Sequence, residues 1–289
     1  MSIKVDHVSY TYMPGTPFEH QALYDVSFEI PDGDFVGIVG HTGSGKSTLV
    51  QIISGLIRGY EGHVYVNEID FSDKKQDRRE LRKQVGVVFQ YPEYQLFEES
   101  VEKDIAYGPT KLGVDPKEVE RRVKAAMDLV ELDYDLFRDK SPFSLSGGQK
   151  RKVAIAGVLA MEPKILIMDE PIAGLDPMGR ENFMQLARSL NECGITILMV
   201  SHNMDNLAEY TKHVLVMNDG RLFMQGTPEE IFSDYTRLRE ASLDLPEVAQ
   251  FAQMLRSRGM DIPPHVIRYD QLKELLLQRF GGNAACCKM

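Results

Sequence analysis

A glycine-rich segment near residue 40 carries the clearest chemical signal in the chain. It fits the pattern G-x-x-x-x-G-K-[ST] and consists of Gly40, His41, Thr42, Gly43, Ser44, Gly45, Lys46 and Ser47. An apolar run, 35–39, precedes it, and a helical pattern beginning at Thr48 follows it. The glycines let successive N–H groups converge on phosphate oxygens, and the helix N-terminus adds partial positive charge. We expect Lys46 to reach the β- and γ-phosphates of a nucleotide and the Ser47 hydroxyl to be a ligand for Mg²⁺.

Two adjacent carboxylates narrow the chemistry that such a phosphate site could perform. Asp169 and Glu170 end the apolar run 165–168, which is typical of a buried strand. Asp169 can complete the Mg²⁺ shell from the carboxyl end of that strand, where α/β sheets bind ligands. Glu170 points in another direction and can accept a proton from an attacking water. The alternative interpretation is an acidic, solvated strand end.

A second possible anion site lies 100 residues after Lys46. Leu145 is followed by Ser146, Gly147, Gly148 and Gln149, and a helical pattern runs from Lys150 onward. A serine and two glycines at a helix start can bind an anion through backbone N–H groups. A single nucleotide scarcely needs two such segments, and a plain turn remains the alternative.

The order of these segments, over about residues 1–230, resembles the ATP-binding cassette (ABC) ATPases. The resemblance implies that Glu170 is the general base, Gln90 the Q-loop glutamine near Mg²⁺ and water, and His202 the switch histidine at the γ-phosphate. It also implies that Tyr12 stacks on adenine, with Tyr10 as the alternative. His41 is expected to contribute its backbone only.

In this family the segment 145–149 meets the γ-phosphate bound by the opposite subunit, so that ATP lies between two subunits. Asp176 would belong to the loop that crosses this interface. The sequence departs from the family pattern at Ile172, where we expect Thr or Ser. That position carries no catalytic assignment.

A narrower resemblance is to the ATPases of energy-coupling factor (ECF) transporters. Segments 89–97, 104–109 and 141–177 carry it, and the stretch 12–23 is similar to the second of the two ATPase subunits. The resemblance implies import of vitamins or transition-metal ions, on the cytoplasmic face of the cell membrane. It also implies three partners, which are a second ABC ATPase, a transmembrane coupling subunit and a substrate-binding membrane subunit. A heterodimer is preferred, and a homodimer stays open.

The apolar and aromatic residues in segment 91–97 are flanked by glutamates, which suits a groove for a helix of a partner. Ordinary packing of a helical subdomain is the alternative. The alternative classes are the ATPase of a conventional binding-protein-dependent importer and a non-transport ABC ATPase. The 98 residues between Lys46 and Leu145 contain no sustained heptads, which disfavours DNA-repair relatives with a long coiled coil.

The elements that must position these residues follow from hydrophobic periodicity. Segments 3–12 and 23–30 alternate apolar and polar residues, as half-buried antiparallel strands do. The runs 35–39, 165–168 and 195–200 are continuous, as in parallel strands covered on both faces. Segments 213–217 and 221–225 flank Asn-Asp-Gly, which predicts a hairpin. Helix starts are expected at Asp115 and Thr227.

The predicted fold class is therefore α/β, with a P-loop ABC ATPase core, an antiparallel β-subdomain, an inserted helical subdomain and a small C-terminal helical appendage. We expect the ATP-binding domain to span 1–235, with the helical subdomain at about 95–160. The appendage is expected at 236–280, with apolar stripes that include Phe251 and Phe280. A disordered tail is expected at 281–289.

Composition excludes several classes of protein. The chain has 289 residues, with Lys+Arg 33 against Asp+Glu 43 and a formal net charge of −10. This balance argues against non-specific nucleic-acid binding, which needs a basic surface. The three cysteines do not form a disulfide framework, so we expect a reducing compartment. The longest apolar run, 153–161, is far short of the roughly 20 residues that span a bilayer.

Overall fold

Two sheets that differ in strand direction form the centre of the computed structural model, which describes residues 2–72 and 78–280. The first sheet is antiparallel, in the order β2-β1-β4-β5, and its strands are β1 Ile3–Tyr12, β2 His20–Ile30, β4 Glu61–Val66 and β5 Ile69–Asp70. The alternation of its buried residues confirms the two predicted antiparallel strands.

The second sheet has the order β10-β9-β3-β8-β7-β6, and all neighbours are parallel except the β9–β10 hairpin. Its strands are β3 Phe35–Val39, β6 Val85–Val88, β7 Ile165–Asp169, β8 Thr196–Val200, β9 His213–Asn218 and β10 Arg221–Gly226. Every residue of β3 and β8 is buried, which confirms that the continuous apolar runs are central strands. The predicted hairpin is also present.

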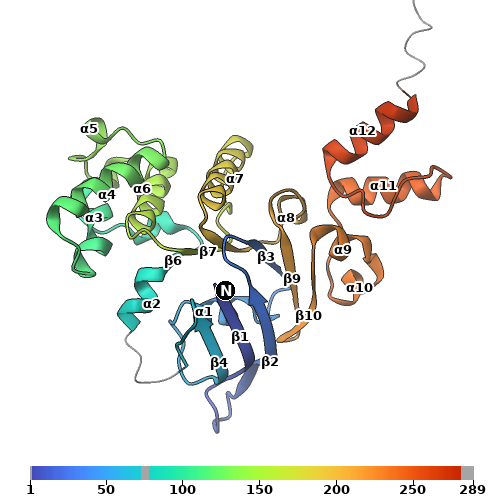
Figure 1. The fold of residues 1–289 in the computed structure, drawn as a ribbon, viewed down its shortest axis with the longest axis horizontal. Coiled ribbons are helices and arrows are strands. Elements are labelled where there is room, and N and C mark those ends of the chain that lie inside the picture. The colour runs from blue at the N-terminus through green and yellow to red at the C-terminus, as the bar shows by residue number, and fades with distance from the viewer. Residues whose placement is uncertain (1, 73–77, 281–289) are drawn as a thin grey trace, which may run out of the picture.

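Helix α1, Lys46–Ile53, lies between the two sheets (Figure 1). Its buried side chains pack in one core with apolar residues of β1, β2 and β4 and with those of β3, β7 and β8. The other face of the parallel sheet is covered by α7, Pro177–Glu192, and α8, Met204–Tyr210. This layering fixes the glycine-rich segment 40–47 at the junction between strand β3 and helix α1.

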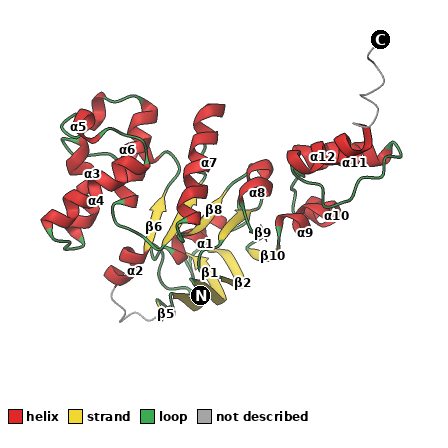
Figure 2. Ribbon diagram, turned by 45° about the horizontal axis from the view of Figure 1, so that its top comes forward, coloured by secondary structure: helices red, strands yellow, loops and turns green. Residues whose placement is uncertain are grey.

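Helices stand on both flanks of the sheets, as Figure 2 shows. On one flank lie α2 Arg78–Gln84, α3 Val101–Lys111, α4 Pro116–Leu129, α5 Tyr134–Phe137 and α6 Gly147–Leu159. Short 3₁₀ turns, Pro92–Gln95 and Pro142–Ser144, precede α3 and α6. Asp115 caps α4 as predicted, whereas α6 begins at Gly147, three residues before the predicted start.

On the other flank lie α9 Pro228–Ser233, α10 Tyr235–Glu240, α11 Glu247–Ser257 and α12 Tyr269–Phe280. Thr227 caps α9 with a reciprocal bond to Glu230, as the sequence predicts. A small apolar core around Ala252 and Leu272 joins α11 and α12. No helix within residues 2–72 and 78–280 combines the length and apolar character needed to cross a membrane.

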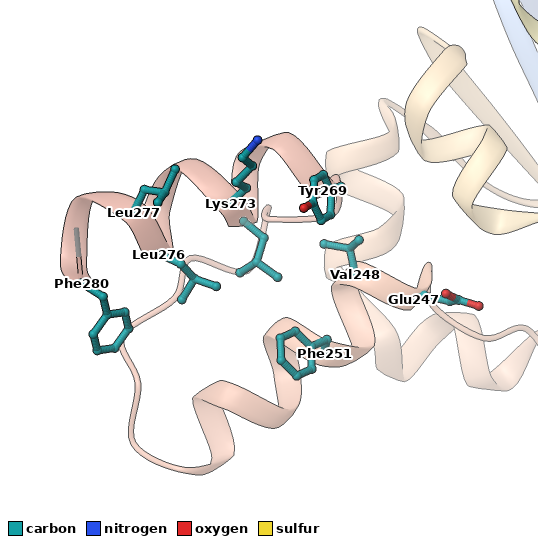
Figure 3. A pocket seen from close by; sticks show the side chains of 9 residues that line it. Glu247, Val248, Phe251, Tyr269, Lys273, Leu276, Leu277 and Phe280 are labelled. Atoms are coloured by element: carbon teal, nitrogen blue, oxygen red, sulfur yellow. The ribbon is translucent and has the colours of Figure 1, made fainter. Parts of the chain in front are cut away.

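The predicted apolar stripes of α11 and α12 are only partly buried. Phe251 and Phe280 are exposed and line a groove of about 710 Å³ between the two helices. In Figure 3 the side chains of Val248, Phe251 and Leu276 point into this groove. The predicted tail, 281–289, lies outside the described residues.

Candidate functional site

The candidate catalytic residues follow four neighbouring parallel strands. In the strand register Ile38 pairs with Val200, Val200 with Asp169, and Met168 with Val88. The chain segments that leave these strands therefore emerge side by side at one edge of the sheet. They contain the glycine-rich segment after β3, His202 after β8, the carboxylates at the end of β7 and Gln90 after β6.

The glycine-rich segment wraps around the ammonium group of Lys46. Its Nζ donates to the Gly40 carbonyl at 2.7 Å, the His41 carbonyl at 2.9 Å and the Ser44 Oγ at 3.3 Å. Lys46 is buried, and this burial lowers its pKa, although Glu170 and Asp169 oppose the shift. The ammonium group is thus held at the base of the loop, beside both carboxylates.

Two glycines of this segment are required by the rest of the chain. A Cβ on Gly40 would lie 2.3 Å from the Met217 carbonyl oxygen. Gly45 has a φ of +96°, which favours glycine, and a Cβ there would lie 2.8 Å from the Ala22 carbonyl oxygen. The segment is therefore fixed between β2 and the β9–β10 turn. The ring of His41 helps, because its Nε2 lies 3.1 Å from Asn218 Oδ1.

Tyr12 is the aromatic residue placed beside the phosphate-binding helix. Its hydroxyl lies 3.2 Å from the hydroxyl of Thr48 in α1. Tyr10 packs edge-on against Tyr12, with 4.8 Å between ring centres, and joins the core between the sheets. Tyr12 is therefore better placed than Tyr10 to meet a base whose phosphates lie at Lys46.

Burial dominates the electrostatics of the two carboxylates. It raises the pKa of Glu170 to about 7, with a further contribution from neighbouring Asp169. Burial also raises the pKa of Asp169, against the attraction of Lys46. Glu170 Oε1 lies 3.5 Å from His202 Nε2 and has no hydrogen-bond partner. A carboxylate poised near neutral pH with an unused oxygen suits a general base.

Three oxygen donors at this edge match the preferences of Mg²⁺. Asp169 supplies a carboxylate, Ser47 an exposed hydroxyl, and Gln90 an exposed side-chain amide. Mg²⁺ favours hard oxygen ligands, takes one or two carboxylates from the protein and completes its shell with waters and substrate phosphates. The residues present therefore fit Mg²⁺ bound together with a nucleotide.

The segment 145–149 forms the start of α6. Ser146 and Gln149 make a reciprocal cap, in which each backbone N–H donates to the other side chain, at 3.1 and 3.4 Å. Gly147 and Gly148 are exposed, and a Cβ on either would meet nothing within 4 Å. Ser146, Gly148 and Gln149 line a cleft of about 770 Å³ between α6 and α7, whose lining contains no residue of 40–47.

Part of the predicted groove at 91–97 belongs to the core. Pro92 and Leu96 are buried, whereas three aromatic residues are exposed together with one from α3. We call this group the aromatic patch, and it consists of Tyr91, Tyr94, Phe97 and Tyr107. Its rings contact in pairs, with centres 6.0 Å apart for Tyr91 and Tyr94 and 4.8 Å apart for Phe97 and Tyr107.

Two residues of the predicted loop stabilise the local fold. Asp176 caps α7 by accepting from the Gly179 N–H at 2.8 Å, and Ile172 is buried in the core. Two charged residues beside the site, the buried Arg151 and the partly buried Glu93, carry no signal of this position in the sequence. In the sequence Arg151 stands between Lys150 and Lys152 and has the appearance of a solvated charge.

A parallel sheet with a glycine-rich phosphate segment, an acidic strand end and a second exposed helix start defines an ABC-type nucleotide-binding domain. The sequence profile described as "ABC transporter" matches residues 23–173. The energy-coupling factor transporter ATP-binding protein EcfA2 of Clostridioides difficile (strain 630) is 50% identical over 288 residues, which cover 99% of this chain and 100% of that protein. EcfA2 of Symbiobacterium thermophilum is 51% identical, over 98% of this chain and 99% of that protein.

Solved structures agree with this result. CbiO1 from Clostridium perfringens, described as part of the ABC transporter complex cbiONQ, gives a TM-score of 0.72 at 37% identity, over 87% of this chain and 98% of that chain. The ATP-binding cassette MJ0796, in a dimeric post-hydrolysis state with ADP and Pi, gives 0.68 at 31% identity, over 78% of this chain and 98% of that chain. The chain belongs to the ABC ATPases, in the family of energy-coupling factor transporter ATP-binding proteins.

Proposed function

We propose that this chain hydrolyses ATP to energise an ECF-type importer of vitamins or transition-metal ions. It would act on the cytoplasmic face of the membrane, paired with a second ABC ATPase and docked on a transmembrane coupling subunit that carries a substrate-binding subunit. The observation that carries the proposal is the pairing of a complete phosphate site at Lys46 with an open helix start at Gly147 and Gly148. Its relatives are named ECF transporter ATP-binding proteins and match the chain over nearly their full length, which supports the transport role.

In the proposed mechanism the residues at the sheet edge divide the work of phosphoryl transfer. The N–H groups of residues 40–47 and Lys46 hold the phosphates and offset the charge that develops on them. Glu170 takes a proton from the attacking water, and His202 hydrogen-bonds the γ-phosphate. Tyr12 stacks on adenine. Mg²⁺, held by Ser47, Asp169 and Gln90, would neutralise phosphate charge when bound.

The second helix start completes the site of the partner. Ser146, Gly147, Gly148 and Gln149 of this chain would meet the γ-phosphate held by the other ATPase. The glycines leave room for that approach, because no neighbour within this chain occupies the space beside them. A heterodimer is preferred on the ECF resemblance. The groove between α11 and α12 offers the partner ATPase a further contact.

The aromatic patch is the proposed docking surface for the membrane coupling subunit. Three of its four rings come from the segment directly after Gln90, so a partner bound there would act on the Mg²⁺ and water side of the site. Exposed aromatic groups are typical anchors of protein interfaces. No nucleic-acid partner is proposed, in keeping with the net charge of −10.

Copurification from native membranes tests this proposal. The tagged chain is extracted with a gentle detergent, and we expect a second ABC ATPase and two small membrane proteins to accompany it. Phe97→Asp should lose the membrane proteins and keep the partner ATPase. Leu56→Asp, at a residue that is 58% exposed and outside the aromatic patch, is the matched control and should retain all three. Association with ribosomes or DNA and no membrane protein would overturn the transport role.

A further inference from the structure

Arg151 is a buried cation that the mechanism above does not use. It lies in the first turns of α6, and its side chain is 6% exposed. Nη2 donates to the Pro171 carbonyl at 2.7 Å and Nη1 to the Ala173 carbonyl at 3.0 Å. One guanidinium group thus binds two carbonyls of the loop that follows Glu170.

That loop controls the backbone of Glu170. Glu170 has a φ of +47°, a left-handed conformation that costs free energy for a residue with a side chain. The Ala173 N–H donates to the Glu170 carbonyl at 3.1 Å and closes a turn. Because Arg151 binds the carbonyls on both sides of Ile172 within this turn, it holds the strained conformation from which the Glu170 side chain reaches the site.

A third element approaches the same guanidinium group. Glu93, in the 3₁₀ turn after Gln90, has its Oε2 3.9 Å from Arg151 Nε. Tyr91, in the same segment, packs so closely on the turn that a Cβ on Gly174 would lie 3.3 Å from its ring. The Q-loop segment, the start of α6 and the Glu170 turn therefore meet at Arg151.

Three buried side-chain polar atoms of the described residues have no hydrogen-bond partner, and two of them, Glu93 Oε2 and Arg151 Nε, lie at this junction. The third is Glu170 Oε1, beside His202. Leaving buried polar atoms unpaired is costly, so a shift that pairs Nε with Oε2 recovers part of that cost. A movement of about 1 Å would bring Nε and Oε2 within hydrogen-bonding distance.

We propose that Arg151 is a positioning residue, which sets Glu170 in place for catalysis according to the position of Glu93 and the start of α6. When Glu93 approaches, Arg151 Nε pairs with Glu93 Oε2. The guanidinium group then moves and shifts the Pro171 and Ala173 carbonyls that it binds. The planar, forked donor set of arginine binds two carbonyls and a carboxylate at once, which the single ammonium group of lysine does not. The inference rests on the assignment of Glu170 as the general base.

The test uses the full chain in its purified complex and measures kcat and KM for ATP hydrolysis together with the melting temperature. Arg151→Lys is expected to lower kcat about 10- to 100-fold, with KM for ATP changed less than about twofold. Loss of packing alone would lower the melting temperature and leave the kcat of the folded protein near its wild-type value.

Glu93 provides the second arm of the experiment. Glu93→Gln should lower kcat in the wild-type background and add little in the Arg151→Lys background, because both act through one path. Lys152→Met and Glu131→Gln are the matched controls, since this neighbouring exposed pair also joins α6 to a loop, and both should retain wild-type kcat. If Arg151→Lys prevents folding, the kcat and KM of Glu93→Gln decide the question alone.

Three results would overturn the proposal. They are an unchanged kcat in Arg151→Lys, a loss of rate that follows the melting temperature alone, and independent, multiplying effects of the two substitutions. Glu170→Gln separates this inference from the base assignment. If Glu170→Gln retains turnover while Arg151→Lys loses it, the base assignment fails and Arg151 does not act through Glu170.

Discussion

The chain contains two helix starts rich in glycine, one enclosed and the other exposed. At the start of α1, Gly40 and Gly45 are enclosed, and a Cβ on either would overlap backbone oxygens at 2.3 and 2.8 Å. At the start of α6, a Cβ on Gly147 or Gly148 would meet nothing within 4 Å. The same residue type therefore answers to two different constraints.

The chain alone forms the site at the start of α1, whereas the start of α6 is left open. At α1 the candidate phosphate site is enclosed by the two sheets and the β9–β10 turn and contains the buried ammonium group of Lys46. At α6 the backbone is capped and stable, but the glycines have no purpose within the chain. A constraint that nothing inside the molecule imposes points to a group from outside, as the proposed two-ATPase sandwich supplies.

The largest expected effect comes from a substitution at the α1 site, which the chain forms alone. Glu170→Gln keeps the shape of the side chain and removes its basicity, so we expect kcat to fall about 10³-fold. ATP binding through residues 40–47 should be retained, and ATP-bound dimers should accumulate, as measured by size-exclusion chromatography. Glu162→Gln, a surface control that pairs with Arg121 and Arg122, should turn over normally. Near-normal turnover in Glu170→Gln would contradict its role as base.

A pair of valine substitutions tests the comparison directly. Gly148→Val should fold with a melting temperature close to that of the wild type, because the added side chain has free space and valine is not disfavoured relative to glycine in a helix. Its kcat should fall about 100-fold, since the side chain would block the partner's γ-phosphate. Gly40→Val should lose the fold, because its Cβ alone overlaps the Met217 carbonyl oxygen.

Thermal unfolding and single-site ATP binding separate the two outcomes. Gly148→Val should still bind ATP at its own Lys46 site with wild-type affinity. An active Gly148→Val chain would mean that the start of α6 faces solvent throughout the cycle, and the comparison would then lose its functional meaning.

Hydrophobic pattern was sufficient to predict the central strands β3, β7 and β8, because residues buried on both faces leave an uninterrupted apolar run. Strand β6 was missed. It has four residues and includes Gly86, where a Cβ would lie 2.7 Å from Val158 of α6. The glycine is a consequence of helix packing, and in the sequence it is indistinguishable from a loop glycine.

The candidate site also contains residues that the sequence indicates and residues that it does not. Lys46, Ser47, Asp169 and the segment 145–149 are indicated by the sequence because phosphate and Mg²⁺ chemistry demands particular residue types at fixed spacings, and their roles stay predictions. Arg151 and Glu93 are not indicated, because what makes them unusual is the burial of Arg151 and the partial burial of Glu93 beside the Glu170 turn. That burial arises only when α6, the 3₁₀ turn after Gln90 and the end of β7 pack together. Contacts between segments that are distant in the chain do not produce a recognisable spacing of residues in the sequence.

The smallest expected effect is the pH dependence of ATP hydrolysis, which tests the electrostatics of the α1 site. Glu170 must be a carboxylate to accept a proton, and burial raises its pKa to about 7. Activity should therefore rise with pH through about 7, and it should fall about tenfold per pH unit well below that value. The measurement is kcat/KM for ATP, which reports the groups of the free protein.

His202 is the other group near Glu170 whose titration could produce such a limb. Burial lowers the pKa of His202, so it should lose its proton before Glu170 does as the pH rises. His202→Gln should consequently reduce the rate and leave the midpoint of the acid limb near 7. A midpoint that disappears with His202 would remove Glu170 from the role of base and place the proton acceptor elsewhere at the sheet edge. A midpoint close to the ordinary glutamate value of 4.5 would show that burial does not raise the pKa of Glu170 in the working protein.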